Sequence, residues 1–419
     1  MQHVTELEVL LSGQPVGQLA RSSKGEIWFE YDDRWIRSGF ALSPMPAFAL
    51  RTGAFKATDA RVFQGLHGVF NDALPDGWGL LLMDRALLAR KGWSRREISP
   101  LDRLAYMGDR AMGALEFRPA MLDAMPSEPP SLDCLAQEAT LLIEGRTETV
   151  LNELYIHGGS PGGARPKVTV ALAQDGNRCI SGFGPLPSGY DHWMVKFRGH
   201  DDPMAMGRIE LAYACMAQSA GVIMPETRLV SARVDGQPQD FFAVRRFDRV
   251  GDVKRHIVSV GGMLELSHRE PSMDYEDVLK LVGMASRDVR EVSKAYRLAV
   301  FNVLAHNQDD HVKNFTLMES GEGNGIWQFS PAYDLTFSSG MGGTEHMTSV
   351  EGEGQPSLAS LQRLGQRLGV DDADSIVQQV FQAVAAWPDF AVEQKVPSGQ
   401  INTIWQGISQ GAAFAALRQ

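Results

Sequence analysis

Residues 306–315 read HNQDDHVKNF, a dense polar run that lies between two apolar stretches of the chain. The segment before it, 292–304, repeats apolar residues at i, i+4, i+7 and i+8, which predicts a helix with one buried face. Polar side chains this dense beside a buried helix are unsuited to a core and to a linker. The run is therefore a candidate functional loop. The plainer interpretation is a solvated loop whose Asp and Asn side chains form turns.

Asp309 and Asn314 are separated by four residues, the spacing that the catalytic Asp and the magnesium-binding Asn have in protein-kinase catalytic loops. The strand-like segments 315–318 and 326–329 flank a glycine-rich turn, which predicts a hairpin. Asp334 follows at the place where a kinase has a second, magnesium-chelating Asp. Two carboxylates and an amide oxygen are the hard ligands that Mg²⁺ prefers. The order Asp, Asn, hairpin, Asp favours an ATP-dependent phosphotransferase over a solvated loop.

The acidic and histidine side chains of this region leave a second chemistry open. Asp309, Asp310, His311 and Asp334, with His306 as a further ligand, are residue types that could form a divalent-metal site for hydrolysis. A hydrolase would not need a glycine loop and a lysine-bearing strand ahead of its metal ligands. Both features lie upstream, and they argue for the phosphotransferase.

The glycine loop is residues 158–167, GGSPGGARPK, which matches neither GxGxxG nor GxxxxGK[ST]. By itself it indicates a surface loop, or backbone that comes close to another group. Arg165 and Lys167 beside four glycines favour an anion, because bare N–H groups and cations both attract phosphate. Ser160 would lie near the γ-phosphate if ATP binds in this loop.

Lys196 interrupts the apolar strand 192–197, where a lone Lys usually faces solvent or extends its head to the surface. In a kinase, the lysine of such a strand binds the α- and β-phosphates and pairs with a helix glutamate. Glu210, which we expect at the start of the next helix, is the nearest candidate for that glutamate.

Residues 242–249, FAVRRFDR, would then form the strand and hinge that pass the adenine. Backbone groups of Arg245 and Phe247 are expected to meet the adenine edge. The alternative is that Arg246, Asp248 and Arg249 form only a local ion-pair network, which is the more common outcome for such clusters.

Composition restricts the class of protein. The chain has 419 residues, 44% of them hydrophobic and 22% charged, which is ordinary for a soluble globular protein of two or three domains. A net charge of −11 makes the whole molecule a poor partner for nucleic acid or an anionic membrane. No run of 18 apolar residues predicts a membrane span, and the first residues lack the pattern of a secretion signal. Cys134, Cys179 and Cys215 are widely spaced, which fits a reducing cytoplasm.

The pattern of elements predicts an α/β (α+β) fold in three parts. Residues 1–130 would form a small β-rich subdomain, with strands near 7–11 and 27–31 and a helix after 74–79, and residues 125–131 are the clearest linker. Residues 131–250 would form an N-terminal kinase lobe with the glycine loop and hinge. Residues 251–419 would form a mainly helical C-terminal lobe with the catalytic loop, and ATP would lie between the two lobes.

Taken together, residues 307–315, 331–334, 246–249 and 160–167 resemble the motifs of HipA-type serine/threonine kinases. These kinases are the toxin halves of bacterial HipBA type II toxin–antitoxin modules. Residues 74–79, LPDGWG, resemble the N-terminal subdomain of that family. The resemblance spans nearly the whole chain in the same order.

The resemblance implies a role for individual residues. Asp309 would be the catalytic Asp, Asn314 and Asp334 would bind magnesium, and Ser160 would be an autophosphorylation site that switches the kinase off. The implied ATP contacts are Gly162, Gly163, Ala164, Arg165, Pro166, Lys167, Lys196, Arg245, Arg246, Phe247, His311, Val312, Lys313, Asn314, Tyr333 and Asp334. Arg165 departs from the family, because many relatives have Gln at this place.

The resemblance also implies partners. Studied relatives phosphorylate aminoacyl-tRNA synthetases and are neutralised by a HipB-like helix-turn-helix antitoxin that represses the operon. The chain would reach DNA only through that antitoxin, would not bind membranes, and would work in the bacterial cytoplasm. A degenerate kinase that serves only as a corepressor is a third hypothesis, and intact Asp309, Asn314, Asp334 and Lys196 argue against it.

Overall fold

Alternating apolar side chains build the first sheet of the protein. Leu7, Val9, Leu19 and Phe29 are fully buried on one face, while their neighbours along the strands are more exposed. The sheet is antiparallel, with the order β4-β3-β2-β1-β5. Its strands are β1 (Glu6–Leu11), β2 (Gln14–Arg21), β3 (Ile27–Tyr31), β4 (Phe55–Lys56) and β5 (Leu115–Arg118). The structure is a computed structural model and describes residues 3–59, 61–121, 130–146, 152–158, 163–176, 178–338 and 345–418.

Among the residues that the structure describes, three α-helices lie in the long connection between β4 and β5. They are α2 (Gly68–Asn71), α3 (Gly77–Lys91) and α4 (Pro100–Met107), while α1 (Asp33–Ser38) follows β3. Helix α4 begins with a capping box, in which the hydroxyl of Ser99 accepts from the Asp102 N–H and the Asp102 carboxylate accepts from the Ser99 N–H. Helix α3 follows Asp76 directly, as expected for a helix after 74–79.

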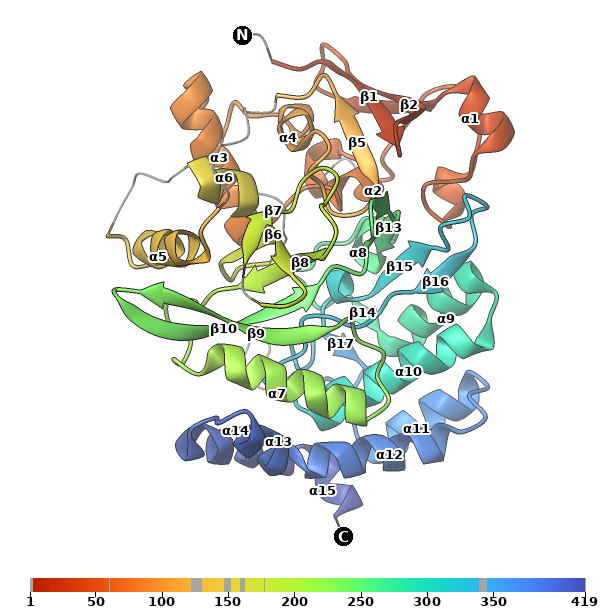
Figure 1. The fold of residues 1–419 in the computed structure, drawn as a ribbon. Coiled ribbons are helices and arrows are strands. Elements are labelled where there is room, and N and C mark those ends of the chain that lie inside the picture. Colours follow the sequence, from red (N-terminus) through yellow and green to blue (C-terminus); the bar gives the residue numbers. More distant parts are fainter. Residues whose placement is uncertain are drawn as a thin grey trace.

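A second antiparallel sheet carries the two lysines of the predicted site. Its order is β7-β6-β8-β10-β9, and Lys167 on β6 lies directly opposite Lys196 on β8. The strands are β6 (Lys167–Ala173), β7 (Cys179–Ser181), β8 (Tyr190–Lys196), β9 (Thr227–Val234) and β10 (Gln237–Arg245). The accompanying helices are α5 (Leu132–Ile143), α6 (Asn152–Gly158) and α7 (Met206–Ser219), and α7 packs against β9 and β10 (Figure 1).

The C-terminal lobe is mainly helical, as predicted. The predicted hairpin forms, with Leu317 opposite Phe329, and β13 adds a third strand to it. The strands of this lobe are β11 (Arg249–Val250), β12 (Val253–Lys254), β13 (Ile257–Ser259), β14 (Met273–Asp274), β15 (Thr316–Glu319), β16 (Trp327–Phe329) and β17 (Thr348–Ser349). The helices are α8 (Val260–Leu264), α9 (Tyr275–Ser286), α10 (Val289–Leu304), α11 (Leu358–Arg367), α12 (Ala373–Ala385), α13 (Trp387–Glu393), α14 (Ser398–Gln410) and α15 (Ala412–Leu417).

Helix α10 ends at Leu304, immediately before the polar run of residues 306–315. Tyr296, Ala299 and Val300 on α10 are fully buried, as their spacing predicts. The apolar spacing that begins at Ile376 does not continue as one helix to Trp387. Helix α12 ends at Ala385, and Trp387 opens α13 ahead of a proline.

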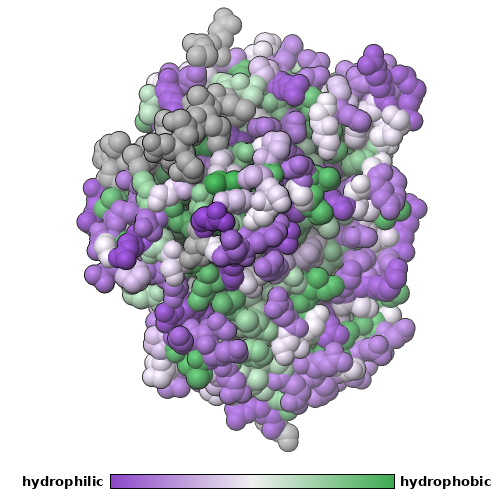
Figure 2. All heavy atoms as spheres, in the orientation of Figure 1, coloured by the Kyte–Doolittle hydropathy of each residue, from purple (hydrophilic) through white to green (hydrophobic). Residues whose placement is uncertain are grey.

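The predicted fold class is confirmed: an N-terminal antiparallel sheet is followed by a second sheet and a helical lobe. The hydrophobic core is continuous through all three parts, since Leu7, Val195, Phe301 and Phe414 belong to one cluster of buried residues. The face in Figure 2 is mostly hydrophilic, with hydrophobic residues in small separate groups. Within the described ranges, no helix is long and apolar enough to cross a membrane.

Candidate active site

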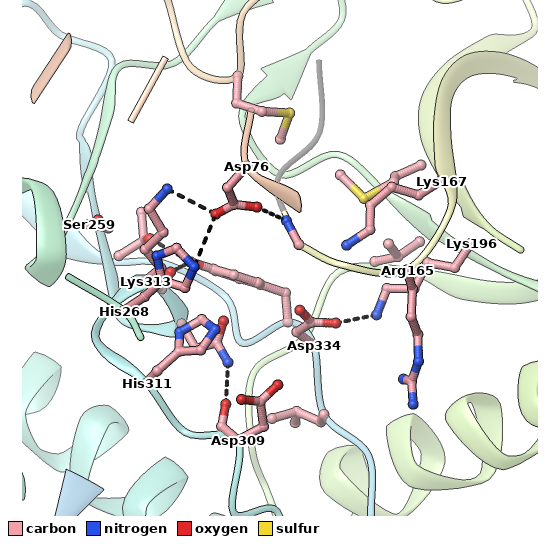
Figure 3. A pocket seen from close by; sticks show the side chains of 18 of the residues that line it. Asp76, Arg165, Lys167, Lys196, Ser259, His268, Asp309, His311, Lys313 and Asp334 are labelled. Atoms are coloured by element: carbon pink, nitrogen blue, oxygen red, sulfur yellow. Dashed lines mark hydrogen bonds and ion pairs between the residues drawn. The ribbon is translucent and has the colours of Figure 1, made fainter. Parts of the chain in front are cut away.

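A cleft of about 550 Å³ lies where the second sheet, the helical lobe and the N-terminal part meet (Figure 3). Most of the predicted site residues line it: Gly163, Ala164, Arg165, Lys167, Lys196, Arg245, Arg246, Phe247, Asp309, His311, Lys313, Asn314, Tyr333 and Asp334. Pro166 and Val312 are not among the lining residues. The Pro166 carbonyl accepts a hydrogen bond from the Phe197 N–H, and Val312 is buried in the core. Ser160 and Gly162 lie outside the described residues.

Lys196 joins the sheet to the helical lobe inside the cleft. Its ammonium lies 2.9 Å from a carboxylate oxygen of Glu210 on α7 and 2.5 Å from one of Asp334. Burial opposes the charge of Lys196, but the two carboxylates outweigh it and raise the pKa of the lysine. The same ammonium, helped by Lys167, holds the pKa of Asp334 well below its usual range. Helix α7 begins four residues before Glu210, at Met206, so the glutamate lies in the second turn and not at the start.

Asp309 presents its carboxylate to the cleft. The residue is exposed. The backbone N–H of Asp309 donates to the Ser338 hydroxyl over 3.0 Å, and the side-chain amide of Asn314 donates to the backbone carbonyl of Asp309 over 2.7 Å. Desolvation by the cleft walls raises the pKa of Asp309, and the nearby charge of Asp334 adds to the effect. A carboxylate with a raised pKa is better suited to accept a proton than an ordinary Asp.

Asp310 faces away from the cleft, although it is the next residue. It is fully buried, and its carboxylate accepts hydrogen bonds from the Tyr275 hydroxyl at 2.7 Å and from the Met347 N–H at 2.8 Å. The His346 ring lies 2.8 Å away. The structure therefore does not bring Asp310 together with Asp309 and Asp334. In the described part of the chain, no three His, Cys, Asp or Glu side chains are grouped as a metal site would require.

One of the backbone groups expected at the adenine edge, the N–H of Arg245, has a partner within the protein. The N–H of Arg245 donates to the Glu226 carbonyl and that of Arg246 to the His192 carbonyl, so neither is free for an adenine edge. The side chain of Arg246 pairs with buried Asp248 at 2.6 Å. Burial would raise the pKa of Asp248, but Arg246 and Arg249 hold it well below its usual range. Arg246, Asp248 and Arg249 therefore form the local ion-pair network that was the alternative interpretation of this cluster.

The side chain of Arg165, at the end of the glycine loop, pairs with acidic residues beside and on α7. Its guanidinium lies 3.0 Å from Asp202 and 3.8 Å from Glu210, the partner of Lys196. This arginine thus pairs with acidic groups beside and on α7.

Sequence reasoning missed Asp76. This residue comes from the N-terminal part, yet its carboxylate accepts a hydrogen bond from the N–H of Gly163 and lies 3.0 Å from the Lys313 ammonium (Figure 3). The LPDGWG motif contained the residue, but nothing in its spacing connects it with a glycine loop more than eighty positions later. Its placement depends on tertiary structure.

The donor groups opposite Lys196 fit magnesium. Asp334 supplies a carboxylate that is 36% exposed in the cleft, and Asn314 lines the same cleft with an amide oxygen. Because the Asn314 NH₂ group already donates to Asp309, its oxygen is the atom left for a cation. One carboxylate and one amide oxygen are hard ligands of the kind that bind Mg²⁺ together with phosphate oxygens.

Comparisons with known proteins identify the family. Residues 159–387 match the family described as HipA-like C-terminal domain, and residues 7–118 match the HipA N-terminal domain. The Sinorhizobium fredii protein named "Putative kinase Y4dM" is 25% identical over 412 residues, 92% of this chain and 92% of that protein. "Putative kinase Y4mE" of the same organism is 26% identical over 361 residues, 79% of this chain and 77% of that protein.

A solved structure shares the fold. It is HipA of the Shewanella oneidensis MR-1 toxin–antitoxin system, in complex with HipB and operator DNA. The TM-score is 0.67 at 16% sequence identity, over 98% of this chain and 97% of that one. The C-terminal family match alone covers more than half of the sequence, and the N-terminal match adds the first sheet and its helices. The chain therefore belongs to the HipA family.

Proposed function

We propose that this HipA-like kinase transfers the γ-phosphate of ATP to a serine or threonine hydroxyl of a protein. The observation that carries the proposal is the position of Lys196, which bridges Glu210 and Asp334 in a cleft that Asp309 and Asn314 also line. A phosphate-binding lysine, its helix glutamate, an acceptor-activating Asp and two magnesium ligands are the parts that kinase catalysis needs.

Each part has a distinct task in this proposal. Lys196 and Lys167 on neighbouring strands would bind the phosphates, and the Phe247 N–H would serve as the hinge donor, because those of Arg245 and Arg246 have other partners. Asp309 would orient the acceptor hydroxyl and accept its proton. When bound, Mg²⁺ held by Asn314 and Asp334 would neutralise charge on the phosphates.

The proposal extends to partners and regulation. We propose a HipB-like helix-turn-helix antitoxin as partner, because the structure with the same fold is HipA in complex with HipB and operator DNA. DNA would be contacted only through that antitoxin, which agrees with the net charge of −11. The proposed substrate is an aminoacyl-tRNA synthetase, the proposed place of action is the bacterial cytoplasm, and phosphorylation at Ser160 is the proposed off-switch. These last three proposals come from the family resemblance.

Incubation of the purified chain with radiolabelled ATP tests the activity. We expect label on the chain itself or on an added protein, dependence on Mg²⁺, and no label with Asp309→Asn. Phosphopeptide mapping then identifies the modified residue. ATP binding without transfer to any protein in a bacterial lysate, for wild type and variant alike, would contradict the kinase proposal and favour the corepressor.

A further inference from the structure

The N-terminal part of the chain lines the cleft with Asp72, Leu74, Asp76, Gly77 and Met112. Within this part, Asp76 and Trp78 bond directly to the glycine loop at Gly163. Asp76 precedes α3 as its N-cap residue, yet its carboxylate caps no N–H of that helix. It accepts instead from Gly163 of the glycine loop and pairs with Lys313 after the catalytic Asp. An N-cap Asp normally serves its own helix, so this departure from a local rule indicates a role elsewhere.

The backbone on either side of Asp76 holds the same point of the glycine loop. The N–H of Trp78 donates to the Gly163 carbonyl over 3.0 Å, so Gly163 is bound through both its N–H and its carbonyl. Gly77 makes this approach possible, because a Cβ there would lie 2.5 Å from the Gly163 carbonyl oxygen and 2.8 Å from the Ala164 Cα. Its positive φ of 43° also disfavours other residues. Residues 76–78 are thus packed directly onto the loop.

The electrostatics of the contact are those of a stable ion pair. The side chains of Asp76 and Lys313 are only 14% and 16% exposed. Burial would raise the pKa of Asp76, but Lys313 and the Gly163 N–H lower it to about 2, so the carboxylate is ionised at neutral pH. His268 lies 3.9 Å away, and burial and Lys313 lower its pKa to about 4, so it is neutral there. Lys313 is therefore the cation that Asp76 orients.

We infer that Asp76 is a positioning residue, which holds the glycine loop at Gly163 and the Lys313 ammonium at the spacing that a bound triphosphate requires. The inference rests on the proposed kinase function. Gly163 and Lys313 both line the cleft but lie 150 positions apart in the sequence, and a single carboxylate bridges them. Without that bridge, the loop and the lysine would have to be ordered when ATP binds, which weakens binding of the phosphates and not of the base.

Asp76→Asn tests this directly, because it keeps the size of the side chain and removes its charge. Calorimetry with Mg–ATP and with adenosine, on the full chain, separates the phosphates from the base. We expect the Kd for Mg–ATP to rise about tenfold or more, as for loss of a charge-assisted bridge, with an unchanged Kd for adenosine. In steady-state assays, the KM for ATP should rise more than kcat falls.

Asp84→Asn is the matched control. Asp84 lies on α3, is 13% exposed, and pairs with Arg103 at 3.0 Å away from the cleft. Its loss should leave the Kd for Mg–ATP unchanged. In a Lys313→Met background, Asp76→Asn should have a smaller effect than in the wild type, because part of the bridge is already gone.

The outcomes separate this inference from the proposed function. An unchanged Kd for Mg–ATP in Asp76→Asn, next to a wild type that binds ATP, would overturn the inference alone. An equal loss of affinity for adenosine and Mg–ATP would also overturn it, because the damage would then be general. A wild type that binds no ATP would overturn the proposed function, and this inference with it.

Discussion

Two neighbouring carboxylates in the polar loop of residues 306–315 have opposite environments. Asp309 is exposed in the cleft, while Asp310 is fully buried and bonded to Tyr275 and to the backbone of residues 347 and 348. The first is available to a substrate, and the second ties the loop to the segment that follows Asp334. Their substitution by asparagine should therefore have different consequences.

Asp309→Asn should lower phosphotransfer by roughly 10²–10⁴-fold, because a neutral amide cannot accept the acceptor's proton. The Kd for Mg–ATP and the Tm should change little, since the hydrogen bonds between Asp309 and other described residues involve its backbone N–H and carbonyl. Phosphotransfer rates test the expected loss of activity, and calorimetry and thermal melts test the unchanged Kd and Tm. Near wild-type turnover would remove Asp309 from the proposed role.

Asp310→Asn should instead destabilise the fold. The amide cannot accept every bond that the carboxylate accepts, so buried donors at Tyr275, Met347 or Thr348 lose a partner. We expect the free energy of unfolding to fall by about 2–4 kcal/mol. Urea denaturation of both variants measures the contrast, and equal stabilities for the Asp309 and Asp310 variants would contradict it.

At the scale of elements, α7 connects the lysine strand β8 with the end of α10, directly before the polar loop of residues 306–315. Glu210 on one turn pairs with Lys196 of β8. Tyr213, on the next turn of the same face, donates from its hydroxyl to the Ala305 carbonyl at the end of α10, over 2.8 Å. A shift of α7 would therefore move the lysine and the loop together.

Glu210→Gln should raise the Mg²⁺ concentration needed for half-maximal nucleotide binding, by roughly several-fold. With its glutamate neutralised, Lys196 would be held by Asp334 alone and would compete more strongly with Mg²⁺ for that carboxylate. Nucleotide binding titrated with Mg²⁺ measures the shift. Glu276→Gln is the control, since that glutamate pairs with Lys280 and Arg367 on α9 and α11. Identical Mg²⁺ curves for wild type and Glu210→Gln would contradict this role.

At the scale of the molecule, buried neutral histidines lie within and beside the N-terminal part. The ring nitrogen Nε2 of His256 lies 2.8 Å from the carbonyl oxygen of Leu42 in the N-terminal part. The ring nitrogen Nε2 of His67 lies 3.1 Å from the carbonyl oxygen of Phe55. In each ring Nδ1 is buried, and no hydrogen-bond partner is found for it among the described residues. Burial lowers the pKa of both histidines to about 4.

Stability should therefore fall as the pH drops from 6.5 towards 4. In this window the unfolded chain binds protons at these histidines and the folded chain does not, so protonation favours unfolding. At pH 5 the loss relative to pH 7.5 should be about 2 kcal/mol for each histidine. Urea denaturation at both pH values measures it, and His256→Gln should reduce the difference. A His256→Gln variant with the full wild-type pH dependence would contradict this assignment.

The sequence by itself determined the order of elements and the polar loop of residues 306–315. The 3.6-residue periodicity of α10, the hairpin before Asp334 and the lysine in an apolar strand are local patterns, and each formed where it was predicted. Local spacing also placed Asp309, Asn314 and Asp334 on one cleft, because short elements separate them along the chain.

Only the tertiary structure decided which of the remaining polar groups face the cleft. Asp310 turns inward, the N–H groups of Arg245 and Arg246 donate to carbonyls of neighbouring segments, and Asp76 at the start of α3 holds Gly163. The residues that make these contacts follow no helix or strand periodicity and have no fixed spacing in the sequence. They arise because the continuous core brings distant segments together, and each buried polar group then pairs with whichever partner the packing leaves within reach.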